Sequence, residues 1–551
     1  MAPSHETKEE SITVLVQTEQ ESQYLEGAKL YGILVGLTIA TFLISLDVSV
    51  IATATPSITS QFHATTDIGW YGATYHLTMC SLQPLSGKIS TTFSLRRSYL
   101  AFFAIFLLGS LLCGAATSSQ MFIVGRAVAG IGGSGVVCGG LSVIAIVTPA
   151  RQRPLFTGLM TSLYALGTVV APIIGGSFTN YVTWRWCFLI NLPAGAVTIV
   201  TLLLFYHPPE GASTEQTESI VQKVKQLDLI GCALFIPSII MVMLAMEWGG
   251  EQYAWNSATI IGLFVGFAAE MIVFILWEIR TGEQAMIPFL LLGDQSVIFS
   301  ILFAFFFMGS FVIPVYYLPE WFQIVKAASP IRSGVMLLPS ICTQVAGSLV
   351  SGILAKSVRY YNPWFFAGST FVCTATGLYT TFTAFTTSSG HWIGFQILQG
   401  FGCGFAAQMP LLTVQYVLRE KPRHIPLGIS TVLFAQYLSS AVMQSIGGSI
   451  FTNRLIAELL SNARLSAVQV NMLLDAGNSK VRDVISEHFP SHLDNIIVAY
   501  NDAITNVFFL AVAGSGLAFL LATGIKWRDT TKSIVGGVQP SEEVSDDSQR
   551  V

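Results

Sequence analysis

The sequence predicts an all-α protein that crosses a membrane many times. Of its 551 residues, 52% are hydrophobic and only 11% are charged, whereas a soluble domain is about 25% charged. Apolar runs of spanning length, about 20 residues each, recur along almost the whole chain, and motifs of its first part return in its last part at a near-constant offset. These observations predict fourteen transmembrane helices: two six-helix bundles in parallel repeat, with two helices inserted between them.

Six apolar runs precede the first long polar segment, and eight follow it. The predicted spans are 30–54, 68–87, 98–117, 121–147, 154–179 and 187–206, then 228–246, 256–278, 296–319, 333–355, 363–385, 391–418, 425–452 and 503–525. The chain then divides into an N-terminal tail (1–28), an N-terminal bundle (29–206), a linker with the two additional helices (207–295), a C-terminal bundle (296–525) and a C-terminal tail (526–551). The outer loop 453–502 alternates apolar and charged residues, which predicts helices on the outer surface.

Three matches define the internal repeat. Arg126, followed by glycines at 130 and 132, corresponds to Gln396, followed by glycines at 400 and 402, an offset of 270. The segment GGSFTN at 175 matches GGSIFTN at 447, an offset of 272, and Gly87 before a basic loop matches Gly352, an offset of 265. Near-equal offsets indicate duplication of a six-helix unit.

Lysine and arginine set the predicted orientation. The loops assigned to the cytoplasm hold Lys88, Arg96, Arg97, Arg151, Arg153, Lys223, Lys225, Arg280, Lys356, Arg359, Arg419, Lys421 and Arg423, and the short opposite loops hold Arg185, Lys326 and Arg332. Both termini are therefore expected in the cytoplasm. The chain shows no sorting signal, so we expect a multi-pass protein of the cell membrane, with a vacuolar or other internal membrane as the alternative. The net charge of −4 offers no basic footprint for nucleic acid.

Two charged residues inside the predicted spans are the first functional candidates. Arg126 is the only charged residue between Ser98 and Ala150, and placing such a charge in a membrane costs about 3 kcal/mol on insertion scales. Asp47 lies about two-thirds of the way along the first span. The plainer alternatives are a solvated helix-end carboxylate for Asp47 and a structural tie between helices for Arg126.

Uncharged polar residues supply the candidates for substrate binding. Gln396 and Gln408 lie on the helix that repeats the Arg126 helix, so we expect them to face a central cavity. The glycines 130, 132 and 135 fit the dinucleotide pattern GxGxxG, but no strand or soluble βαβ unit accompanies them. We interpret them as sites of close helix packing.

Several motifs together resemble the fourteen-helix drug:proton antiporter branch of the major facilitator superfamily, in its fungal toxin and multidrug efflux form. LDVSVIATATP (46–56) is similar to the first-helix signature of that branch, with Ser49 and Ala52 as departures. GKISTTFSLRR (87–97), with Gly87, Arg96 and Arg97, resembles the loop motif of the superfamily, except that Thr91 replaces an aspartate.

The fifth predicted helix resembles the antiporter motif, and WRWCFLINLPAG (184–195) a boundary motif of the same branch. The antiporter motif is carried by Gly158, Gly167, Ala171, Pro172, Gly175 and Gly176, with the alanine in place of a glycine. Small residues permit a close helix interface, and proline frees a backbone carbonyl and bends a helix. A hinge against a helix of the other half is therefore expected.

The resemblance implies proton-coupled efflux of a small amphipathic organic compound, such as a drug, toxin or secondary metabolite, by alternating access. Asp47 would take the proton, Arg126 would influence its protonation and stabilise occluded states, and residues 158–176 would form the moving interface. A monomer in the lipid bilayer, driven by the proton gradient and without cofactor, metal or enzymatic activity, is expected. The alternatives are a fourteen-helix importer, for instance of iron-siderophore complexes, and a non-transporting membrane sensor.

Overall fold

The chain is helical throughout the part that the structure describes. The structure is a computed structural model, and it describes residues 27–64, 67–206, 219–250, 252–287, 289–355, 357–476 and 481–529. Residues 1–26 and 530–551 of the predicted tails, and 207–218 of the linker, lie outside the described residues. Eleven helices in the described part are long and apolar enough to cross a membrane.

The N-terminal bundle follows the first six predicted spans. Its helices are α2 (Gly27–Phe62), α3 (Ile68–Ser81), α4 (Gln83–Thr92), α5 (Leu95–Gly114), α6 (Ser119–Val147), α7 (Arg153–Tyr181), α8 (Trp186–Leu189) and α9 (Asn191–Phe205). The second span is divided at Leu82 into α3 and α4. Pro84 lies in the first turn of α4, where its missing N–H costs no helical hydrogen bond.

The inserted segment and the C-terminal bundle complete the chain. The inserted helices are α10 (Ile220–Lys225), α11 (Leu229–Trp248), α12 (Ala258–Thr281), η2 (Gly282–Gln284) and α13 (Phe289–Leu292). The bundle contains α14 (Gln295–Ile324), α15 (Pro330–Met336), α16 (Leu338–Leu354), α17 (Asn362–Tyr379), α18 (Ser389–Ala406), α19 (Met409–Val417), η3 (Leu418–Glu420), η4 (Pro422–His424), α20 (Ile425–Ser461), α21 (Ala467–Ala476), α22 (Val481–His488), η5 (Pro490–His492) and α23 (Leu493–Ala522). Three predicted spans correspond to helices outside the eleven: the divided α3 and α4, the shorter α16, and α17 with its serine, threonines and glycines.

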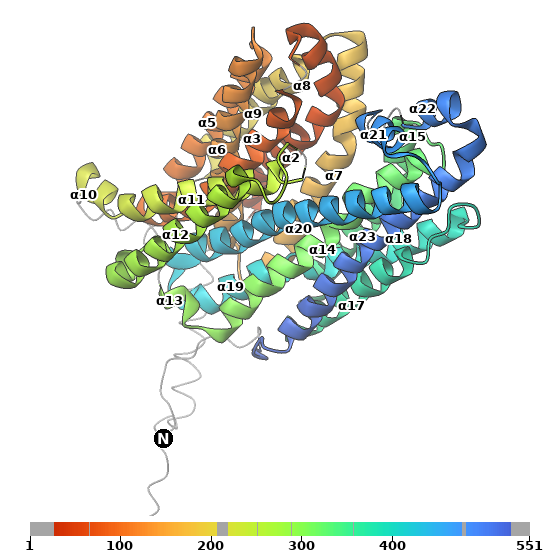
Figure 1. Ribbon diagram of the computed structural model, residues 1–551. Helices are drawn as coiled ribbons and strands as arrows, with labels where there is room; N and C mark the ends of the chain where they lie inside the picture. Colours follow the sequence, from red (N-terminus) through yellow and green to blue (C-terminus); the bar gives the residue numbers. More distant parts are fainter. Residues whose placement is uncertain are drawn as a thin grey trace, which may run out of the picture.

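The two halves are separate bundles whose helices have matching neighbours (Figure 1). In the first half α2 packs on α7 and α9, and α6 packs on α3 and α5. In the second half α14 packs on α20 and α23, and α18 packs on α16 and α17. The inserted α11 contacts both halves, through α3 and α20. Its ring contact between Phe235 and Phe434, at 5.2 Å between centroids, is one of these bridges.

Glycines permit the close approach of helices inside each half. A side chain at Gly130 would collide with Thr78 and the Tyr75 carbonyl of α3, and one at Gly400 would collide with Thr343 and the Ser340 carbonyl of α16. The interpretation of the glycine run as helix packing is therefore confirmed.

The segment between α20 and α23 forms a small helical cap, and the helices that its alternating pattern predicted are present. α21 and α22 lie at the ends of α20 and α23 (Figure 1). Apolar side chains, including Leu473 and Ile485, are buried there. Arg482 Nη1 donates a hydrogen bond of 2.5 Å to the Ile324 carbonyl at the end of α14. The cap is thus attached to the bundle by apolar contacts and by a charged donor on unpaired helix-end carbonyls.

Candidate functional site

The structure brings the two charged candidates, Asp47 and Arg126, together in one buried ion pair. Arg126 Nη1 on α6 lies 2.5 Å from Asp47 Oδ2 on α2, and their side chains are 1% and 0% exposed. The same nitrogen lies 3.4 Å from the Asp47 carbonyl. Asp47 is therefore not a solvated helix-end residue. Each of the two buried charges is compensated mainly by the opposite charge of its partner.

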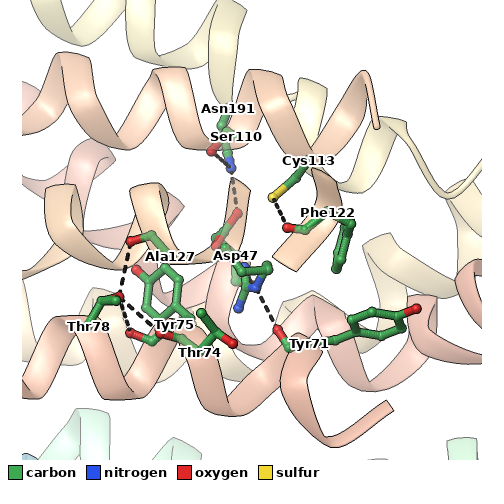
Figure 2. A network of polar contacts seen from close by, with 11 residues as sticks. Asp47, Tyr71, Thr74, Tyr75, Thr78, Ser110, Cys113, Phe122, Ala127 and Asn191 are labelled. Carbon is green, nitrogen blue, oxygen red and sulfur yellow. Dashed lines mark hydrogen bonds and ion pairs between the residues drawn. The ribbon is translucent and has the colours of Figure 1, made fainter. Parts of the chain in front are cut away.

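Neighbouring helices hold each member of the pair in place (Figure 2). Arg126 Nε donates to the Tyr71 carbonyl of α3 at 2.9 Å, and the guanidinium lies 4.5 Å from the centre of the Tyr75 ring. Asn191 Nδ2 donates to Asp47 Oδ1 at 3.1 Å and to Ser110 Oγ at 3.0 Å. Helices α3 and α9 thus contact the charges of the pair directly, and α5 holds Asn191 through Ser110.

A large cavity lies between the two halves, next to the ion pair but separated from it. Its volume is about 1070 Å³, and helices of both bundles and α11 line it. It reaches the helix ends opposite the basic loops, as shown by the lining residues Trp70, Gln252 and Asn453. At the other end Val137 and Leu411 contribute to an apolar floor.

The helix α3 forms the wall between the cavity and the pair. Tyr71 and Tyr75, one turn apart, face Arg126, whereas Gly69, Gly72 and His76 line the cavity. A Cβ atom added to either glycine would meet no atom within 4 Å, so the cavity reaches the backbone of α3 there. The ion pair is therefore close to the cavity without lining it.

The end that carries the basic loops is closed by two equivalent contacts between the halves. A Cβ at Gly87 would lie 3.0 Å from the Pro426 carbonyl of α20, and a Cβ at Gly352 would lie 2.8 Å from the Pro154 carbonyl of α7. Gly158 faces the Ser348 carbonyl of α16, at 2.7 Å from its added Cβ. Gly87 and Gly158 therefore lie where the halves meet.

The remaining motif residues have other surroundings. Gly167 and Gly175 pack against Ser45 and Thr53 of α2, inside their own half, and Gly176 has no neighbour within 4 Å of an added Cβ. Pro172 is exposed on α7. The expected interface between halves is thus made by the first glycine of the motif, while the later ones pack within the bundle or against nothing.

The loop motif contributes Lys88 rather than its arginines to the packing of the inserted helices. Lys88 Nζ donates to the carbonyls of Gln284 and Ala285, at 2.9 and 2.8 Å. Burial lowers the pKa of this lysine, while the nearby carboxylates of Asp228 and Glu278 act in the opposite direction. Of the predicted arginines, Arg96 donates to the Leu203 carbonyl at 2.8 Å and Arg97 is exposed. Thr91, in the position of the missing aspartate, donates to the Lys88 carbonyl of its own helix.

The two glutamines lie away from the cavity, contrary to the expectation for their side chains. Gln396 is buried and donates to the Met336 carbonyl at 3.0 Å. Gln408 donates to Ser351 Oγ at 2.8 Å and lies beside Gly158, at the contact between halves. Neither side chain lines the cavity; Gln344 and Gln436 do. Position on the repeat of the Arg126 helix does not fix which side of that helix a residue occupies.

Three contributors were missed by sequence reasoning. Asn191 belongs to the WRWCFLINLPAG segment, but an uncharged amide in an apolar run gives no signal of an ionic partner. Tyr75 is one of many aromatic residues. The inserted helix α11 also lines the cavity, with Met243, Glu247 and Trp248. A glutamate one residue from the end of an apolar segment is the signal that could have indicated this.

Comparisons with known proteins agree with this architecture. The model of the Major Facilitator Superfamily matches residues 37–444. The MFS-type transporter poxA of Penicillium oxalicum is 45% identical over 511 residues, which cover 92% of this chain and 90% of that protein. Efflux pump mlcE of Penicillium citrinum is 40% identical over 534 residues, covering 96% and 95%. The structure of the proton:xylose symporter XylE superposes with a TM-score of 0.57 at 14% identity, covering 92% of this chain and 98% of that chain, and has the same fold. The chain therefore belongs to the major facilitator superfamily.

Proposed function

We propose that this protein is a proton-coupled exporter of a small amphipathic organic compound, such as a drug, toxin or secondary metabolite. The observation that carries the proposal is the buried Asp47–Arg126 pair directly behind the wall of a large cavity. In alternating access the surroundings of the pair change, so Asp47 can bind a proton in one state and release it in the other. The relative named as an efflux pump supports export over import.

In the proposed cycle, Asp47 takes up a proton from the side to which the cavity opens. Protonation removes the charge that compensates Arg126, while the Tyr71 carbonyl and the Tyr75 ring continue to hold the guanidinium. Leaving one buried charge without its partner costs about 3–5 kcal/mol. That is enough to shift the balance between two packings of the halves, which meet at Gly87 and Gly158.

The proposal includes the membrane arrangement. All fourteen predicted segments cross the bilayer, the three weaker ones being α3 with α4, α16 and α17. The basic loops and both termini lie in the cytoplasm, so the cavity faces outward. The protein acts as a monomer in the cell membrane, and the proton gradient is its energy source.

Transport into inside-out membrane vesicles tests the proposal. An imposed pH gradient, acidic inside, is expected to concentrate a substrate found by screening a compound panel, and a protonophore is expected to abolish the accumulation. ATP should not replace the gradient. Coupled movement in the opposite direction would establish an importer, and binding without any flux would establish a sensor.

A further inference from the structure

Two buried carboxyl groups meet outside the cavity, at the end of the inserted helices that lies beside the basic loops. Asp228, the N-cap of α11, and Glu278, in the last turn of α12, are 7% and 4% exposed. Both accept a hydrogen bond from the same donor, since the Met286 nitrogen lies 3.2 Å from Asp228 Oδ2 and 3.0 Å from Glu278 Oε1. The two groups are close enough to share a hydrogen bond when one of them is protonated.

The charges around these two carboxyl groups balance when the pair holds one proton. The ionisable side chains that face the pair from the surrounding helices are Lys88 of α4 and the Cys232 thiol of α11. With both carboxyl groups ionised, the buried cluster would carry two negative charges and one positive charge. Desolvation and the neighbouring negative charge both oppose the second ionisation. One bound proton makes the cluster neutral.

The hydrogen bonds indicate that Glu278 carries most of this proton. Asp228 Oδ1 accepts from Trp277 Nε1 at 2.8 Å and from the Gly231 nitrogen at 3.0 Å, in addition to the Met286 donor at Oδ2. Glu278 Oε2 accepts from one donor only, the Ile287 nitrogen at 2.8 Å. Donors stabilise the ionised form of a carboxyl group, so the more fully solvated charge belongs to Asp228.

The segment 282–287, which these groups hold, connects the inserted helices to both halves. Its N–H groups at 286 and 287 face the carboxyl pair, and its carbonyls at Gln284 and Ala285 accept from Lys88 Nζ. The segment leads into α13 and α14 of the C-terminal bundle (Figure 1). Lys88 follows Gly87, where the halves meet. The attachment of 282–287 is therefore part of the closed end.

We propose that Asp228 and Glu278 form a second proton-binding site, separate from Asp47, and that its shared proton determines how firmly residues 282–287 are held. Without the proton, the two carboxylates repel each other beside a single N–H donor. Their excess charge also draws Lys88 away from the two carbonyls.

The direction of the pH dependence follows from this arrangement. The held state binds the proton, so the attachment is firm at low pH and loosens as the pH rises and the proton is lost. Arg280 and Gln284, beside the pair, are exposed, so the site is close to the solution at the basic end. Under the proposed membrane arrangement, the site therefore responds to the pH of the cytoplasm.

Hydrogen exchange of the full-length protein in nanodiscs tests this inference. Dividing the intrinsic exchange rate at each pH by the observed rate gives a protection factor that is free of the chemical effect of pH. From about pH 5.5 to about pH 8.5, which spans the range in which a buried carboxyl group titrates, we expect protection of residues 282–287 to fall. The expected fall is about tenfold, from the loss of one charge-assisted hydrogen bond. Constant protection in the wild type would overturn the inference without any variant.

The variant Glu278→Gln should keep high protection over the whole range. Its amide oxygen can accept from Ile287, its NH₂ group can donate to Asp228 as the protonated acid would, and it does not titrate. Glu270→Gln is the matched control, because it makes the same change eight residues earlier on α12, about 12 Å along the helix axis. It should show the wild-type fall. A wild-type fall in Glu278→Gln, or its loss in Glu270→Gln, would overturn the inference.

The outcome is separable from the proposed function. Asp47→Asn should retain the fall in protection at 282–287, and its disappearance there would assign the titration to Asp47 and overturn the second site. Transport driven by a pH gradient, with protection of 282–287 that does not change with pH, contradicts this inference alone. A fall in protection that depends on Glu278, without transport driven by pH, contradicts the proposed function alone.

Discussion

At the scale of single residues, the ion pair combines two properties that a coupling site needs. Both charges are removed from water, so each depends on the other, and Asn191 and the Tyr71 carbonyl fix their positions. Such a pair contributes less to stability than its short distance suggests, because its desolvation offsets much of the attraction. Neutralising one partner of the pair has a large energetic effect, because it leaves the other charge buried without compensation.

Removing the charge of one partner should therefore lower the stability of the protein more than removing both charges. Asp47→Asn and Arg126→Gln are each expected to lower the thermal stability of the purified protein, at a cost of about 3–5 kcal/mol. The double variant should recover most of that loss, because it leaves no buried charge without a partner. Thermal unfolding in detergent measures this, and a double variant as unstable as the sum of the singles would contradict the isolation of the pair.

The geometry of the guanidinium should matter beyond its charge. Arg126→Lys retains the charge but lacks a planar donor group that reaches Asp47 and the Tyr71 carbonyl together. We expect at least about a tenfold slower export at equal abundance, from the loss of more than one charge-assisted hydrogen bond. Arg185→Lys is the control, because Arg185 also donates to two carbonyls, those of Gly114 and Ala116, away from the ion pair. Equal effects of the two variants would contradict a special role of Arg126.

Sequence reasoning could find the charged members of the site but not their neutral partners. Asp47 and Arg126 are conspicuous because a charge in an apolar segment requires an explanation. Asn191 and Tyr75 are ordinary residues in their segments, and only the packing of α3 and α9 against α2 and α6 gives them their roles. Gln396 and Gln408 show the converse, since a polar residue in a span can bond to a carbonyl of a neighbouring helix and never reach the cavity.

At the scale of elements, the contacts between halves at the basic end are built from glycines against carbonyl groups. Gly158→Val should separate α7 from α16, because the Ser348 carbonyl leaves no room for a side chain. We expect faster hydrogen exchange in residues 83–92 and 425–432, where the closed end would open. Gly176→Val, in the same motif but without neighbours within 4 Å of an added Cβ, should leave the exchange unchanged. Similar exchange in both variants would show that the contact does not control closure.

The attachment of the inserted helices to the N-terminal bundle gives a second prediction at this scale. Lys88→Met retains the aliphatic part of the side chain but removes both hydrogen bonds to the Gln284 and Ala285 carbonyls. Exchange should rise in residues 282–287, and Lys225→Met, at an exposed position of α10, should not alter it. Protection of that segment in Lys88→Met would show that Asp228 and Glu278, which accept hydrogen bonds from Met286 and Ile287, suffice to hold it.

Helix positions were predictable from apolar runs, because hydropathy depends on the sequence alone. The interruptions of the helices and their packing partners were less predictable. The second span is divided at Leu82 because Pro84 begins a new helix there. The apolar run by itself gives the length of the span and does not indicate this division. The contacts of α11 with both halves depend on three-dimensional packing, and an inserted segment without a counterpart in the repeat offers no internal comparison.

At the scale of the whole molecule, the cavity opens opposite the basic loops, so orientation in the membrane determines which side it faces. Tags near residues 10, 215 and 545, all outside the described residues, are expected in the cytoplasm, and a tag near residue 475 is expected outside. Protection of each tag from an impermeant reagent in intact cells measures this. With residue 10 in the cytoplasm, an outer position for residue 215 would contradict a six-helix first half.

The central claim is that Asp47 carries the coupled proton, and the most direct measurement compares two modes of transport by Asp47→Asn in the same proteoliposomes. Exchange of labelled for unlabelled substrate at equal concentrations and equal pH requires binding and alternation but no net proton transfer. We expect Asp47→Asn to retain this exchange while losing accumulation driven by an imposed pH gradient, with the wild type performing both. Accumulation by Asp47→Asn to the wild-type level under the same gradient would contradict the account.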